Sequence, residues 1–151
     1  MDNSLVPALE QARLAIRTAG LQKSNETAEL HGLSLSDSQM RGLILAEDES
    51  LRAMGRLEFG EGILPRLMYS FCDSPYISRD SWMDTLLALQ ELFYTFKNEL
   101  YDALTDDELL EAMNKIFHGR AQGSLVYLEN MATDMLLKAL RSDGDEDDDD
   151  D

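Results

Sequence analysis

The sequence has little of what anchors or cross-links many proteins: one cysteine, three prolines and no long apolar run. A single cysteine, Cys72, cannot form an internal disulfide, which is typical of a reducing compartment. The longest uninterrupted apolar stretches fall far short of the ~20 residues that a membrane-spanning helix needs. The first seven residues contain no basic residue and no apolar run long enough for a signal peptide. We therefore predict a cytoplasmic protein with no membrane association.

Basic residues are also scarce, since 13 of them face 30 acidic residues and the net charge is −17. Eight of the acids lie in residues 142–151, which hold no base. This acidic tail cannot bury enough apolar area to order itself, so we predict that it is disordered. The bases elsewhere are scattered singly, so no nucleic-acid partner is expected. Mimicry of nucleic acid would need carboxylates held at phosphate-like spacing, which a disordered tail does not supply.

Helical periodicity is what the sequence does contain, almost from end to end. The length and the 44% apolar share suit one helical domain over residues 1–141, in which 1–25 can form a peripheral arm. No segment alternates with a period of two, so the predicted fold class is all-α, a compact bundle of about six helices. The predicted helices span 7–19, 36–54, 62–72, 82–102, 105–118 and 124–141, with a short turn at 25–31.

Capping residues mark several of these boundaries. Gly20 is predicted to end the first helix, because glycine readily takes the conformation that follows a helix. Ser36 and Gln39 have the spacing of a capping box, in which each side chain pairs with the other residue's backbone amide. Thr105 and Glu108 form the clearest capping box in the chain. These signals predict where the second and fifth helices begin.

The spacing of the apolar residues predicts which side chains lie together on one face of a helix. In the first helix, Leu9, Ala12, Ile16 and Ala19 lie on one face. The helix over 82–102 is predicted to be central, because it carries an aromatic stripe at core spacing: Trp82, Phe93, Tyr94, Phe96 and Tyr101. The acidic run 47–49 is expected on the solvent side of its helix, with Glu47 the acid nearest the apolar stripe.

Motifs for catalysis, cofactors or metals are absent from the sequence. There is no HExxH, GxSxG or phosphate-loop pattern, and the tail lacks the ligand spacing of a calcium loop. His31 and His118 each precede a glycine at a predicted helix end, where the helix dipole favours a cation. Cys72 precedes Asp73, whose charge would raise the pKa of the thiol, so Cys72 is interpreted as a core residue. We predict no catalytic, cofactor-binding or metal-binding residue.

Charged residues on glycine-rich connections form the one candidate site. Loops held by a rigid scaffold often carry function, which favours a ligand or partner site there. The structural alternative is that Arg56 or Arg120 locks a helix end by pairing with Asp73 or Glu58. The candidate residues are Arg56, Glu58, Glu61, Asp73, Arg120 and Gln122.

Four sequence blocks carry a resemblance to a known family: GRLEFGEGIL (55–64), FCDSPYI (71–77), FYTFKNE (93–99) and GRAQGSL (119–125). In this order they are similar to an uncharacterised bacterial family of small proteins from Firmicutes, a domain of unknown function. The resemblance covers residues 20–141, and the acidic tail departs from it. The family has no assigned activity, so it implies no catalytic residue. Its members are often encoded beside a second, larger protein, which implies a protein partner.

The resulting functional hypothesis is a non-enzymatic accessory protein that acts through a protein partner, such as the product of a neighbouring gene. The acidic surface favours a basic partner. The alternative hypothesis is a small-molecule or hydrolytic site on the loops around Glu58, Glu61, Asp73 and Arg120. That alternative requires the four side chains to converge in one cleft.

Overall fold

The computed structural model of the chain describes residues 5–58 and 61–141, which are helical with no strand, so the predicted all-α class is confirmed. The predicted disordered tail, 142–151, lies outside the described residues. None of the helices in the described part is long and apolar enough to cross a membrane. The elements are α1 (Leu5–Glu29), α2 (Asp37–Ala53), α3 (Leu64–Phe71), the 3₁₀ turn η1 (Arg79–Ser81), α4 (Trp82–Glu99), α5 (Asp106–His118), α6 (Leu125–Asn130) and α7 (Asp134–Arg141).

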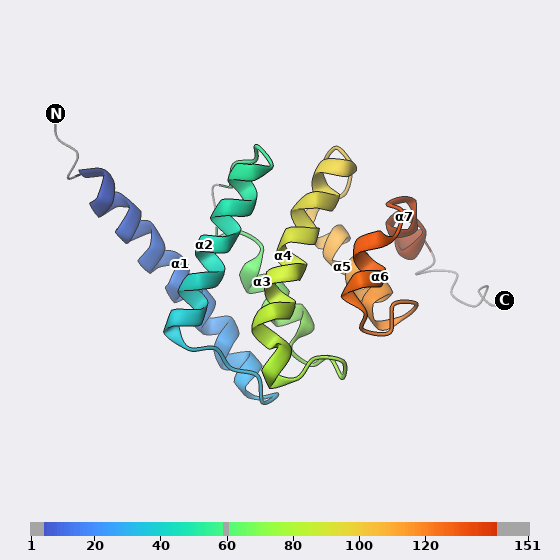
Figure 1. The fold of residues 1–151 in the computed structure, drawn as a ribbon, viewed down its shortest axis with the longest axis horizontal. Helices are drawn as coiled ribbons and strands as arrows, with labels where there is room; N and C mark the ends of the chain where they lie inside the picture. Colours follow the sequence, from blue (N-terminus) through green and yellow to red (C-terminus); the bar gives the residue numbers. More distant parts are fainter. Residues whose placement is uncertain (1–4, 59–60, 142–151) are drawn as a thin grey trace.

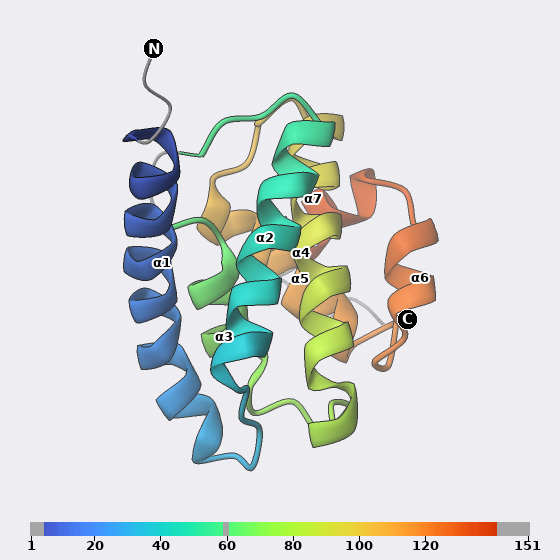
Figure 2. The same ribbon diagram turned by 60° about the vertical axis from the view of Figure 1, so that its left-hand side comes forward.

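Helix α4 lies at the centre of the arrangement, as its aromatic stripe predicts (Figure 1). It packs against α2, α3, α5, α6 and the turn η1, whereas α1 packs against α2 and α3. Figure 2 shows α1 along one edge of the molecule, with α6 along the opposite edge. Four of the five predicted stripe aromatics are buried, and Tyr101 is 91% exposed, because it follows the end of α4 with a left-handed φ of 53°.

Both predicted capping boxes are present. The Ser36 hydroxyl accepts from the amide of Gln39, and the Thr105 hydroxyl accepts from that of Glu108. In each box the Gln or Glu side chain returns a bond to the first residue's amide. These local signals place the starts of α2 and α5 correctly, because each is satisfied within four residues of sequence.

Gly20 does not end the first helix, so that prediction is wrong: α1 runs through it to Glu29 and absorbs most of the turn predicted at 25–31. Beyond Gly20, the side chains of Leu21 and Ala28 are buried in the core. The Asn25 amide also exchanges two hydrogen bonds with the backbone of Leu35. These tertiary contacts outweigh the cost of about 1 kcal/mol for glycine inside a helix.

The N-terminal half of α1 extends away from the other helices (Figure 1). The face that carries Leu9, Ala12, Ile16 and Ala19 is exposed, with Leu9 at 60% and Ile16 at 68%. Residue Arg17, by contrast, is only 5% exposed. The peripheral arm over 1–25 stays a prediction, and Arg17 and Leu21 within that range are buried.

The predicted helix over 124–141 is two helices, α6 and α7, so its continuity is wrong and the described residues form seven α-helices. Met131 follows α6 with an extended backbone (ψ 160°), which stops the helix without a glycine or proline. The break lets α6 pack against α4 and α5 while α7 packs against α5. The break therefore lets Leu128 of α6 and Leu136 of α7 both be buried.

Candidate functional site

A surface groove of about 720 Å³ lies between α3 and α5. Pro65 and Tyr69 of α3 and Leu110 of α5 supply its apolar lining, and Ser24 of α1 also lines it. Tyr69 is 67% exposed, whereas Phe71, the other aromatic residue of α3, is buried. The reason is local: α3 turns Leu64, Leu67, Met68 and Phe71 into the core, so Tyr69 lies on the outer face. We call this hollow the α3–α5 groove.

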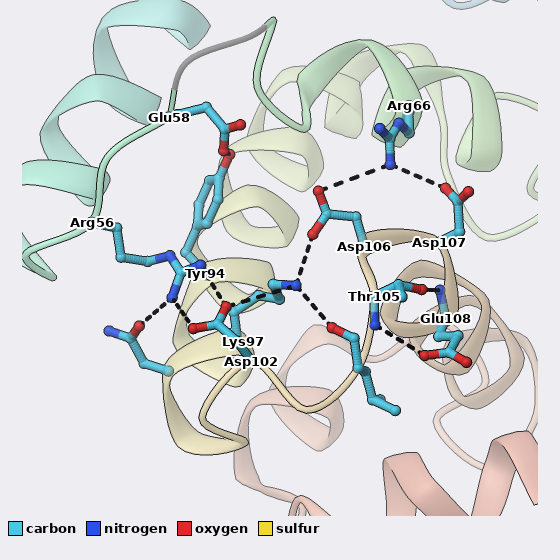
Figure 3. A network of polar contacts seen from close by, with 12 residues as sticks. Arg56, Glu58, Arg66, Tyr94, Lys97, Asp102, Thr105, Asp106, Asp107 and Glu108 are labelled. Carbon is cyan, nitrogen blue, oxygen red and sulfur yellow. Dashed lines mark hydrogen bonds and ion pairs between the residues drawn. The ribbon is translucent and has the colours of Figure 1, made fainter.

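Acidic residues predominate around the α3–α5 groove, where Asp73, Asp107 and Glu111 accompany Arg66 and Lys115. The Arg66 guanidinium is 3.0 Å from the Asp107 carboxylate (Figure 3). The Lys115 ammonium donates to the carbonyl of Ala139 and lies 3.8 Å from the Glu111 carboxylate. Asp73 is exposed and forms no ion pair with any other described residue. The groove therefore presents a negative edge beside an exposed aromatic ring.

Buried Glu47 forms a second polar cluster, on the side of the core that faces α1. Its carboxylate pairs with the buried Arg17 guanidinium of α1. It also accepts from the Tyr94 hydroxyl (2.7 Å) and the Ile63 amide (2.9 Å). The Arg17 guanidinium reaches Asp48 as well. The acidic run 47–49 was expected to face solvent, and this is wrong for Glu47, which is 0% exposed. Glu47 lies one helical turn after Leu43 and Ile44, so it shares the core face of α2 with them. We call these residues the Glu47 cluster.

Burial determines the protonation behaviour of this cluster. Loss of water raises the pKa of Glu47, and the Tyr94 hydroxyl, Arg17 and the Ile63 amide oppose that rise. Burial and the neighbouring Glu47 carboxylate raise the pKa of the Tyr94 phenol far above its usual range. The Tyr94 hydroxyl also lies 3.2 Å from Glu58, but its one proton can be donated to only one carboxylate. Because Glu47 is saturated by internal partners, this cluster fits a structural role.

Arg56 locks the end of α4, with different partners from those predicted. Its guanidinium is 2.6 Å from the Asn98 side-chain oxygen and 2.7 Å from the Asp102 carboxylate, and lies over the Tyr94 ring (Figure 3). Lys97 extends the network to the start of α5 through Asp106, 2.8 Å away. Figure 3 shows these contacts in one continuous chain of polar groups. Arg56 thus pairs with neither Glu58 nor Asp73, the two partners proposed for it from the sequence.

The remaining sequence-predicted site residues are dispersed. Glu61 lies against α1, where its carboxylate would be 3.0 Å from a Cβ placed on Gly20. Asp73 lines the α3–α5 groove. Arg120 and Gln122 are exposed on the connection between α5 and α6, and Gln122 has a left-handed φ of 49°. Of the six candidates, Arg56 and Glu58 meet at Tyr94, and Asp73 lies in a different part of the molecule.

Sequence reasoning missed the groove residues Tyr69, Leu110 and Glu111. One signal was available for Tyr69. The apolar residues of its helix form two adjacent stripes, and Tyr69 belongs to neither: Ile63, Leu67 and Phe71 form one, and Leu64, Met68 and Cys72 form the other. An aromatic residue left outside both stripes indicates an exposed ring. Leu110 and Glu111 carried no such signal, since the groove exists only after α3 and α5 pack together. Within the described residues, no group of three or more His, Cys, Asp and Glu side chains is placed to hold a metal ion.

Comparison with known proteins places this arrangement in a family. Residues 20–146 match the model of a family of unknown function (DUF6323). The chain belongs to this family. The family match confirms the resemblance seen in the four sequence blocks, all of which fall inside the matched range. It begins at Gly20, so about the first four turns of α1, at ~3.6 residues per turn, lie before it. Neither the curated proteins nor the solved structures contain a match.

Proposed function

We propose that this protein is a non-enzymatic accessory protein of the cytoplasm that binds a partner protein through the α3–α5 groove. The observation that carries the proposal is Tyr69, an exposed aromatic residue beside the apolar Leu110 and the unpaired Asp73. Aromatic residues in partly enclosed pockets are the commonest energetic centres of protein interfaces. A helical groove of this kind accepts an amphipathic helix, whose apolar side packs against the ring.

The charge of the groove supports a partner segment with basic residues. Arg66 already pairs with Asp107, and Lys115 already donates to a backbone carbonyl. Asp73, which forms no ion pair with any other described residue, therefore remains to attract positive groups on an incoming helix. The net charge of −17 adds a long-range attraction for the same kind of partner. The product of a neighbouring gene, which the family resemblance implies, is the first partner to test.

A photo-crosslinking amino acid at position 69 tests the proposal in the host cell. The matched control carries it at position 101, where the native tyrosine is also exposed and lies outside the groove. We expect one host protein to crosslink from position 69 and not from position 101. Replacing Asp73 with lysine should weaken that crosslink, and so should high salt, because both reduce the attraction for a basic helix. Equal crosslinking from both positions would contradict the proposal.

A further inference from the structure

The exposed apolar face of α1 has no partner within the described residues. Leu9 and Ile16 are 60% and 68% exposed, and Ala12 and Ala19 are exposed beside them. At 3.6 residues per turn this face points directly away from the buried side of the helix, which carries Arg17 and Leu21. Two large apolar side chains on one helix face are costly to leave in water. Figure 2 shows that α1 forms an edge of the molecule, so this face is open.

We propose that a second copy of this chain packs against this face, with the two α1 helices antiparallel about a two-fold axis. The spacing of the residues carries the argument. When the axis passes level with residue 14, Leu9 of each copy lies opposite Ala19 of the other. The same axis places Ile16 opposite Ala12. Every large side chain then meets a small one, which lets the two helices approach closely and interdigitate.

The charge of this segment allows a second copy to approach this face. Residues 5–23 contain three bases and one acid, whereas the whole chain has 13 bases and 30 acids. Two copies of so acidic a protein repel each other less at a face that holds few acids. The positive charges of Arg13 and Arg17 add little repulsion between the two copies, because both side chains pair with Asp48 of α2. The α3–α5 groove, with its acidic edge, is unsuited to a second copy for the same reason.

Sedimentation velocity of the full chain over a range of protein concentrations tests the proposal. We expect a monomer–dimer equilibrium that Ile16→Glu weakens by about thirtyfold or more, the effect typical of an interface centre. The matched control is Leu45→Glu, which alters another exposed leucine (56% exposed) on α2 and should leave the equilibrium unchanged. A wild-type chain that stays monomeric at every concentration would overturn the proposal. So would a dimer that Ile16→Glu leaves intact.

The register has its own test in a mixture of two single variants, Ala12→Cys and Ile16→Cys. Because positions 12 and 16 lie opposite each other across the axis, the mixture should form a mixed disulfide faster than either variant alone. The native Cys72 is 4% exposed and should not compete. Equal rates in all three samples would contradict the antiparallel register. Tyr69→Ala should leave the dimer unchanged and weaken only partner binding, which separates this proposal from the one for the groove.

Discussion

The carboxylate of Glu47 occupies the space where a side chain at position 62 would lie. A Cβ placed on Gly62 would clash with the Glu47 carboxylate, and Gly62 has a left-handed φ of +80°. The next amide, that of Ile63, donates to the same carboxylate. Glycine at this position therefore serves two purposes, since it allows the turn into α3 and gives the buried acid its space.

Replacement of Gly62 by alanine should destabilise the protein more than the same change at Gly32. Both glycines have a left-handed φ, but nothing lies within 4 Å of a Cβ on Gly32. Gly32→Ala should cost about 1 kcal/mol in the free energy of unfolding, from backbone strain alone. Gly62→Ala should cost about 3 kcal/mol or more, because it also displaces a buried carboxylate from its partners. Urea unfolding measures both, and equal losses would contradict the steric role of Glu47.

Replacement of Gly42 by alanine should stabilise the protein. Gly42 lies inside α2, and a Cβ there would meet only the end of the Met83 side chain at 3.6 Å, an ordinary contact. Alanine in a helix interior is favoured over glycine by about 1 kcal/mol. The expected gain in the free energy of unfolding is of that order and is measured in the same urea experiment. A loss would mean that α2 and α4 approach more closely than described.

Removal of the Tyr94 hydroxyl should weaken the Glu47 cluster. Tyr94→Phe leaves the buried carboxylate without one of its donors, which should cost about 1–3 kcal/mol in the free energy of unfolding. Tyr101→Phe is the matched control, because that ring is 91% exposed and its loss of a hydroxyl should change stability little. Thermal unfolding of the two variants compares them. Similar midpoints for both would show that the Tyr94 hydroxyl contributes nothing.

Stability should depend on pH through Glu47. Because burial raises the pKa of this carboxyl above its ordinary 4.5, the folded state holds the proton more tightly than the unfolded chain does. The contribution of Glu47 is therefore full at low pH and declines as the pH rises above about 4.5. Glu47→Gln removes this decline, so the difference in the free energy of unfolding between the variant and the wild type should shift in favour of the variant as the pH rises above about 4.5. Glu49→Gln, an exposed acid on the same helix, is the control and should follow the wild type.

The thiol of Cys72 should react slowly in the folded protein. It is 4% exposed, and both burial and the adjacent Asp73 carboxylate raise its pKa, as its interpretation as a core residue requires. A thiol reagent should modify it at least about a hundredfold more slowly in the native protein than in the urea-unfolded chain. Fast labelling under native conditions would indicate that the packing around α3 opens readily.

The sequence by itself determined the features that depend only on residues close together in the chain. The all-α class follows from apolar periodicity, and the starts of α2 and α5 follow from capping boxes that close within four residues. The family was also recognisable, because its blocks are contiguous segments. Among the candidate site residues, the glycine-rich loop indicated that Arg56 and Glu58 form polar contacts. It did not predict their partners, which are Asn98 and Asp102 for Arg56 and Tyr94 for Glu58.

Tertiary structure alone decided the features that depend on residues far apart in sequence. Gly20 stays helical because of contacts with distant residues, and α6 separates from α7 because it packs against α4 as well as α5. Glu47 is buried because Arg17, Tyr94 and Ile63 converge on it from three other segments. The α3–α5 groove and the open face of α1 exist only once the helices have packed. Periodicity predicts that a helix has an apolar face, but only packing decides whether that face meets the core, and for α1 it remains exposed.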